Sequence, residues 1–155
     1  MKFRFIVFIL LSLVVYSCGS AKKARVREQK INTIINTARS YVGTPYRWGG
    51  TTRGGIDCSG LLCNSFRTVN YTLPRTSNEQ SKVGVKVKKG KLQPGDLVFF
   101  ATGKKRRKIT HVGLVTEVRG GSVKFIHSSS SLGVVENDLD SDYYKKRFIT
   151  ARRPF

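Results

Sequence analysis

Residues 55–61 read Gly-Ile-Asp-Cys-Ser-Gly-Leu, which places a cysteine at the expected start of a helix. Asp57 fits as the N-cap residue, because an aspartate side chain accepts hydrogen bonds from the free N–H groups of the first helical turn. Cys58 then lies in that turn, where unpaired N–H groups and the helix dipole favour a thiolate. The segment makes Cys58 a candidate nucleophile, although a lone cysteine is more often structural.

Helical periodicity extends on both sides of this segment. Upstream, apolar side chains spaced for one helix face run from Ile31 to Val42, and Gly43 is the expected C′ residue. Residues 44–56 are too apolar for a linker and too rich in glycine for a regular element, which predicts a structured loop. Downstream of Cys58, the apolar spacing through Val69 predicts that its helix continues.

Strand patterns fill the second half of the chain. Ser77 and Gln80 have the spacing of a capping box and predict one more short helix. The expected strands are residues 97–100 after a Pro-Gly-Asp turn, 111–118 and 123–127 as a hairpin, and short final strands at 133–135 and 148–151. Helices first and antiparallel strands after them predict a single α+β domain, with N-terminal helices packed on an antiparallel sheet.

The chain has two histidines, His111 and His127, at the start and end of the predicted hairpin. Antiparallel pairing places them on neighbouring strands, although the sequence leaves the register open. A Cys–His pair with a third polar group that orients the imidazole is the general arrangement of an activated thiolate. We therefore expect His111 to act as the base for Cys58 and His127 to accept the other ring proton. Without the cysteine, each histidine taken alone would be interpreted as an ordinary strand residue.

The cysteine spacing argues against a disulfide or a metal site. Cys58 and Cys63 are five residues apart, more than one helical turn, so a bridge between them is geometrically poor. Cys63 is interpreted as a small buried apolar residue. The sequence contains no Cys-x-x-Cys pair and no closely spaced histidine pair. We expect no metal and no other cofactor.

The N-terminus is typical of an export signal. Lys2 and Arg4 precede an apolar run at residues 5–15, which is too short to span a membrane comfortably. Cys18 follows this run and resembles the cysteine of a bacterial lipobox, so cleavage before Cys18 and its lipidation are expected; plain secretion with an incidental cysteine is the alternative. This predicts a signal peptide at 1–17, a lipidated cysteine and basic tether at 18–27, and a catalytic domain at 28–155.

The charge is strongly unbalanced. Lys and Arg number 29 against 9 Asp and Glu, a net charge of +20. Such a surface attracts polyanions, which include nucleic acid, anionic lipid and acidic wall polymer. No nucleic-acid-binding motif is present, and an export signal directs the protein away from nucleic acid. The basic run at 104–108 is expected to be an exposed loop that could border the active-site cleft.

Several ordered blocks resemble the NlpC/P60 family of cell-wall cysteine peptidases over about residues 31–153. They are VGTPYRWGG at 42–50, GIDCSGL at 55–61, LPRTS at 73–77 with Gln80, LQPGDLVFF at 92–100, HVGL at 111–114 and FIHSSS at 125–130. The resemblance implies a papain-like fold in permuted order, with Cys58 as nucleophile, His111 as base and His127 as the orienting residue. It also implies that the Tyr46 hydroxyl and the Cys58 backbone N–H stabilise the oxyanion.

Other residues of the matching blocks have competing roles. Asp57 and Ser59 could cap the helix or contact substrate, and Arg75 could bind a substrate carboxylate or be an ordinary surface arginine. Trp48 is expected to pack the loop.

By resemblance, the substrate is peptidoglycan, cut at stem or cross-link peptide bonds that involve D-glutamate or diaminopimelate. The expected protein is a monomer in the cell envelope, anchored by lipid on Cys18 at the periplasmic face of the outer membrane. An adaptor protein is a candidate partner, and nucleic acid is not. The alternatives are a catalytically silent or partner-regulated wall-binding lipoprotein of the same fold, and a related amidase or acyltransferase.

Overall fold

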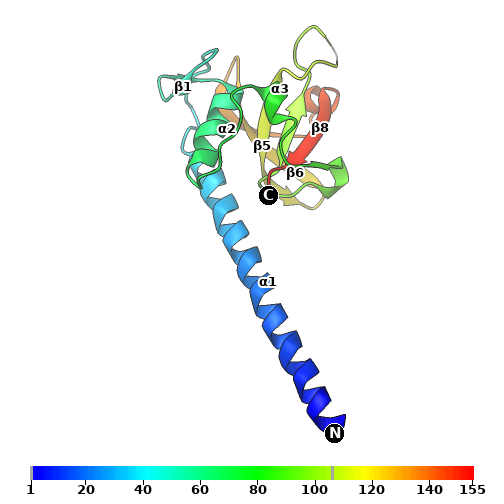
Figure 1. Cartoon of the computed structure of the whole chain (residues 1–155). Coiled ribbons are helices and arrows are strands. Elements are labelled where there is room, and N and C mark those ends of the chain that lie inside the picture. Colours follow the sequence, from blue (N-terminus) through cyan, green and yellow to red (C-terminus); the bar gives the residue numbers. More distant parts are fainter. Residues whose placement is uncertain (1, 106) are drawn as a thin grey trace. The chain divides into compact units, whose positions relative to one another are not determined.

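The computed structural model describes the backbone of residues 2–105 and 107–155 and the side chains of residues 21–105 and 107–155 (Figure 1). The chain forms two compact units, one ending at Lys30 and the other running from Ile31 to Phe155. The elements are α1 (Lys2–Arg39), β1 (Thr51–Thr52), β2 (Gly55–Ile56), α2 (Cys58–Arg67), α3 (Ser77–Gln80), β3 (Val85–Val87), η1 (Lys89–Lys91), β4 (Leu97–Phe100), β5 (His111–Arg119), β6 (Ser122–Ser129), β7 (Gly133–Asp138), α4 (Asp142–Lys145) and β8 (Phe148–Arg153).

Helix α1 includes the backbone of the predicted tether. Its last turn ends at Arg39, before the expected stop at Gly43, because residues 40–43 form turns that lead into a contact with β7. The Gly43 N–H donates to the Val134 carbonyl at 3.0 Å, and Gly43 has a φ of 83°. The side chains of the predicted signal segment, including Cys18, lie outside the described residues. Among the residues described, no helix is long and apolar enough to cross a membrane.

The sheet has six strands in the order β3-β8-β4-β5-β6-β7, and every neighbouring pair is antiparallel. The predicted hairpin is β5–β6, whose turn is built from Gly120 and Gly121 at positive φ values of 56° and 85°. Helices combined with an antiparallel sheet confirm the α+β prediction. Edge strand β3 and the small β1–β2 ribbon were not predicted, since both are only two or three residues long.

Two apolar clusters lie on opposite faces of the sheet. On one face, α2 packs on β5 and β6, joined by the end of α1. The buried side chains there are Ile31, Ile34, Ile35, Ala38, Leu61, Leu62, Phe66, Leu97, Phe99, Val112, Leu114, Ile126 and Val134, among others. The other face buries Val98, Phe100, Val115, Phe125, Leu139 and Ala151. This packing fixes the N-terminus of α2 against the first residues of β5.

A buried ion pair ties the turn before β4 to the last strand. Asp96 is fully buried, and its two carboxylate oxygens accept hydrogen bonds from Arg153 Nε and Nη2 at 2.7 and 2.8 Å. The Gln93 N–H donates to the same carboxylate at 2.8 Å. Two parallel bonds from a guanidinium to a carboxylate give a strong and geometrically specific contact.

Replacing Arg153 with Met should destabilise the domain, because it leaves the Asp96 carboxylate buried and without its cation. We expect a loss of about 3–5 kcal/mol in the free energy of unfolding, measured by urea denaturation at pH 7. The control is Lys89→Met, which breaks the exposed Lys89–Asp140 pair and should cost about 1 kcal/mol or less. Equal, small losses in both variants would contradict this account of Asp96.

Candidate active site

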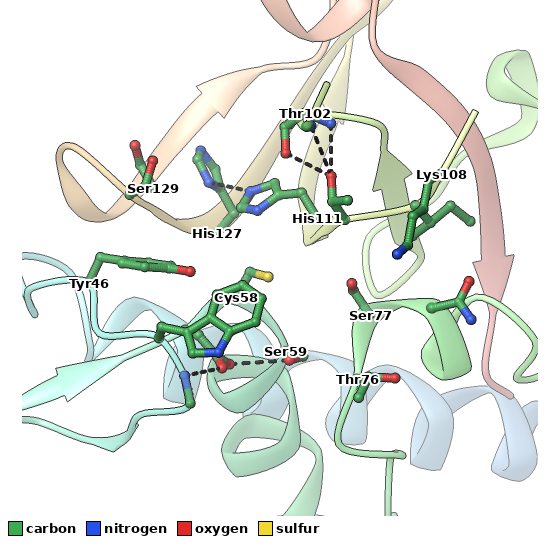
Figure 2. Close-up of a pocket in the computed structure, with 18 of the residues that line it drawn as sticks. Tyr46, Cys58, Ser59, Thr76, Ser77, Thr102, Lys108, His111, His127 and Ser129 are labelled. Atoms are coloured by element: carbon green, nitrogen blue, oxygen red, sulfur yellow. Dashed lines mark hydrogen bonds between the residues drawn. The ribbon is translucent and has the colours of Figure 1, made fainter. Parts of the chain in front are cut away.

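A cavity of about 750 Å³ opens between the N-terminus of α2, α3 and the β5–β6 hairpin (Figure 2). One side carries Tyr46, Cys58 and Ser59, and the facing side carries Thr102, Lys108, His111 and His127 (Figure 2). Asp57 also lines the cavity. The predicted catalytic and substrate-binding residues therefore line one cavity, although they lie up to 81 positions apart in the chain, from Tyr46 to His127.

Cys58 begins α2, as the sequence predicted. Asp57 is the N-cap, and its carboxylate accepts from the Gly60 N–H at 2.7 Å and from the Gly49 N–H at 3.0 Å. Burial raises the pKa of Cys58 to about 11, and the nearby Asp57 charge also raises it. Backbone N–H groups of Val112, Ser59 and Cys58 itself act in the opposite direction. The thiol is therefore protonated in the resting site, and a thiolate forms only with a proton acceptor at hand.

The two histidines are joined directly. His111 Nε2 lies 2.9 Å from His127 Nδ1, with the rings nearly perpendicular. His111 Nδ1 is thus the ring nitrogen that remains available to a group in the cavity. Figure 2 shows the Cys58 side chain extending toward the His111 ring. The β5–β6 register that the sequence left open pairs Leu114 with Ile126, which brings the two rings together.

Both imidazoles are neutral in this environment. Burial lowers the pKa of His111 to about 3, and His127 adds to the effect. Burial also lowers the pKa of His127, which is only 1% exposed. Transfer of the thiol proton to His111 is unfavourable with these pKa values, so the ion pair needed for attack on a carbonyl depends on the attraction between thiolate and imidazolium once the proton moves.

Tyr46 lines the cavity next to the nucleophile. Its hydroxyl is directed toward Cys58 in Figure 2. Burial raises the pKa of Tyr46, with smaller contributions from Cys58 and Asp57, so the hydroxyl keeps its proton and can donate it to an oxyanion. Its loop is held in place by the Ile56 N–H, which donates to the Pro45 carbonyl at 3.0 Å.

Arg75 binds the helix cap rather than standing free on the surface. Its Nη1 donates to Asp57 Oδ1 at 2.9 Å and to Ser59 Oγ at 2.8 Å, and its Nη2 donates to Asp57 Oδ2 at 2.7 Å. Burial by itself raises the pKa of Asp57, but the bonds from Arg75 and Gly60 reverse this, and the net pKa is lowered. Asp57, Ser59 and Arg75 thus form one clamp at the start of α2.

Trp48 differs from its expected environment, whereas Cys63 packs against the core as expected but is only partly buried. Trp48 is 86% exposed at the cavity rim, so it does not pack the loop as predicted; its loop is instead held by backbone hydrogen bonds such as Gly50 N–H to the Arg47 carbonyl at 2.9 Å. Cys63 is half-buried, and its thiol lies 3.4 Å from the Pro74 carbonyl. In the part of the chain described, no group of three or more His, Cys, Asp or Glu side chains is placed to hold a metal ion.

The sequence did not predict the two polar groups that contact His127 Nε2. Its Nε2 lies 2.8 Å from Asn137 Oδ1 on β7 and 3.1 Å from the Tyr144 hydroxyl on α4. Neither residue lies in one of the sequence blocks that resemble the family. The sequence offered only their positions, with Asn137 just after the predicted strand at 133–135 and Tyr144 shortly before the predicted strand at 148–151.

The sequence pattern of the NlpC/P60 family matches residues 43–153. The chain belongs to the NlpC/P60 family. This confirms the resemblance drawn from the sequence blocks.

Named relatives and solved structures agree with this NlpC/P60 membership. The chain is 37% identical to "Probable endopeptidase NlpC" of Escherichia coli (strain K12), covering 97% of this chain and 99% of that protein. It is 39% identical to "Murein DD-endopeptidase MepS/Murein LD-carboxypeptidase" of the same strain, covering 77% of this chain but only 61% of that protein. An NlpC/P60 family protein from Bacillus cereus ATCC 10987 superposes with a TM-score of 0.70 at 35% identity, over 79% of this chain and 39% of that one. Relatives named as endopeptidases agree with the prediction that the chain is an enzyme.

The lowered pKa values predict how stability depends on pH. An unfolded histidine binds a proton near pH 6.5, whereas folded His111 does so only near pH 3, so the unfolded state gains protons first as pH falls. The free energy of unfolding should therefore decrease from pH 6 to pH 4, by up to about 1.4 kcal/mol per pH unit for each such histidine. Urea denaturation of His111→Gln over this range should show a shallower decrease than wild type. Identical slopes would mean that His111 titrates normally in the folded protein.

Proposed function

We propose that this chain is a peptidoglycan endopeptidase that cuts stem or cross-link peptide bonds involving D-glutamate or diaminopimelate, with Cys58 as nucleophile. The observation that carries the proposal is the meeting of the Cys58 thiol and the hydrogen-bonded His111–His127 pair in one open cavity. The endopeptidase names of the relatives support the reaction class.

The first half of the reaction forms an acyl-enzyme. His111 Nδ1 takes the Cys58 proton, and the sulfur attacks the carbonyl carbon of the scissile bond. The Cys58 backbone N–H and the Tyr46 hydroxyl donate to the tetrahedral oxyanion. As this intermediate collapses, the C–N bond breaks, the Nδ1 proton passes to the leaving amine, and a thioester remains on Cys58.

The second half releases the acid product. Water enters in place of the amine, and His111 Nδ1 removes one of its protons while the oxygen attacks the thioester carbonyl. The C–S bond then breaks, and the proton returns to the Cys58 sulfur. His127 orients the His111 ring for both half-reactions, since its Nδ1 lies 2.9 Å from His111 Nε2. All steps use side chains of this chain and water.

Charge at the cavity supports a substrate with free carboxylates. Peptidoglycan stems carry such groups, and a net charge of +20 favours their approach. Lys108, at the end of the basic run, lines the cavity, and Figure 2 shows its side chain extending toward Ser77 on α3. We assign Lys108 to a carboxylate of the stem peptide.

The location follows from the N-terminal segment. We propose that residues 1–17 are a signal peptide, that Cys18 carries lipid, that residues 18–27 are a tether, and that residues 28–155 are the catalytic domain. The domain would then work at the periplasmic face of the outer membrane, close to the wall. The basic side chains Lys22, Lys23 and Arg25 of the tether are exposed, and they favour an anionic surface.

The direct test is digestion of purified peptidoglycan by the protein in mild detergent, with mass spectrometry of the soluble fragments. Wild type should release fragments whose masses name the bond, and Cys58→Ala should release none while keeping its fold. Cys63→Ser is the matched control and should keep nearly full activity, because Cys63 lies outside the lining of the cavity. Activity in Cys58→Ala, or its loss only in Cys63→Ser, would reject the proposed nucleophile. No fragments from folded wild type would favour a wall-binding or partner-regulated protein.

Lys108→Gln should weaken binding of a soluble stem peptide more than it slows the chemistry. We expect KM to rise about twofold to fivefold with kcat nearly unchanged, as for one exposed charge contact. The effect should shrink at high salt. Lys86→Gln on edge strand β3 is the control, since it removes the same charge away from the cavity. Equal KM values in the two variants would show that only net charge matters.

A further inference from the structure

Two polar groups of different hydrogen-bonding capability contact His127 Nε2, and one of them, Tyr144, also lines the cavity. The Asn137 amide oxygen, 2.8 Å from His127 Nε2, can only accept a hydrogen bond. The Tyr144 hydroxyl, 3.1 Å from the same nitrogen, can donate or accept. These two groups therefore determine whether Nε2 carries the proton of a neutral His127.

The tautomer of His127 determines the tautomer of His111. If Asn137 accepts from Nε2–H, then His127 Nδ1 has a free lone pair and must accept from His111 Nε2–H across their 2.9 Å contact. His111 Nδ1 is then unprotonated and able to take the Cys58 proton. If Tyr144 donated to His127 Nε2 instead, both histidines would switch tautomer, and His111 would present Nδ1–H to the thiol. That form cannot act as a base.

The fold presents Asn137 at the required position. Strands β6 and β7 pair Phe125 with Asn137 and His127 with Val135, so Asn137 is the diagonal neighbour of His127 on the same sheet face. Phe125 stacks on the His127 ring at 5.0 Å between centroids, and Tyr144 packs edge-on at 5.2 Å. The ring is thus confined between aromatic side chains, and its nitrogens stay aligned with His111 and Asn137.

We propose that Asn137 is a positioning residue whose amide oxygen fixes both histidines as Nε2–H tautomers and so makes His111 Nδ1 the base for Cys58. This inference rests on the proposed function of the thiol. Asn137 does not line the cavity, and it acts only through His127. The role differs from that of Tyr144, whose hydroxyl is compatible with either tautomer.

The tautomers can be read directly by two-bond ¹H–¹⁵N correlation of the imidazole nitrogens at pH 7. The chain has two histidines, so His127→Gln assigns both ring systems. Wild type should show Nε2–H for both. Asn137→Leu should shift both toward Nδ1–H, whereas Asn137→Asp, which keeps an acceptor, should preserve the wild-type pattern. Glu136→Gln is the control on the same strand, because Glu136 pairs with Arg39 and not with the histidines.

A second readout is the rate of Cys58 alkylation by iodoacetamide, followed by peptide mass spectrometry, which needs no wall substrate. We expect a loss on the order of 100-fold in Asn137→Leu and recovery to within about threefold of wild type in Asn137→Asp, by analogy with the large effect of a wrong tautomer on other base-activated nucleophiles. If Asn137→Leu does not fold, the tautomers of wild type and of Asn137→Asp still test the inference. Nδ1–H at His127 in wild type, or unchanged tautomers and alkylation in folded Asn137→Leu, would overturn the inference. If the tautomers and alkylation rates are as expected but wild type does not digest peptidoglycan, the proposed function is rejected and the inference about Asn137 stands.

Discussion

The 2.9 Å hydrogen bond between His111 and His127 is the contact on which the site depends. It exists because β5 and β6 pair Leu114 with Ile126 and Val115 with Phe125, before the register shifts between Val115 and Glu117, and Gly113 permits that close pairing. A Cβ at Gly113 would come within 2.4 Å of the Phe125 ring, which itself stacks on His127. A larger residue would displace Phe125 and, with it, the ring that orients the base. Apolar packing of β5 and β6 under α2 then sets this pair against the nucleophile.

The nucleophile is positioned by a second set of close contacts. A Cβ at Gly60 would lie 2.5 Å from the Gly50 carbonyl, so the first turn of α2 approaches the preceding loop as only glycine allows. The Asp57 N–H donates to that carbonyl at 3.1 Å, while the Asp57 carboxylate is held by Arg75. Arg75 and backbone N–H groups thus partly neutralise the negative charge of Asp57. This limits the extent to which Asp57 opposes a thiolate at Cys58.

The sequence alone predicted those parts of the site that depend on local signals. Capping at Asp57 located Cys58, and the glycine pair after β5 located the hairpin that carries both histidines. The sequence could not predict the register between β5 and β6 or the partners of Arg75, because these depend on how separate segments of the chain pack together. The roles of Asn137 and Tyr144 were not predicted for the same reason. Each contacts His127 only in the folded protein, from β7 and α4 respectively. The exposure of Trp48 likewise reflects a loop held by its own backbone.

Catalysis by this route requires a covalent intermediate on the sulfur of Cys58. Rapid acid quenching of the protein with a soluble stem peptide, followed by mass spectrometry of its cysteine-containing peptides, measures this most directly. We predict a thioester-linked stem fragment on the peptide that contains Cys58 and an unmodified Cys63. Turnover with no acylated Cys58 at any quench time, together with undiminished turnover after Cys58 is blocked by alkylation, would contradict the account.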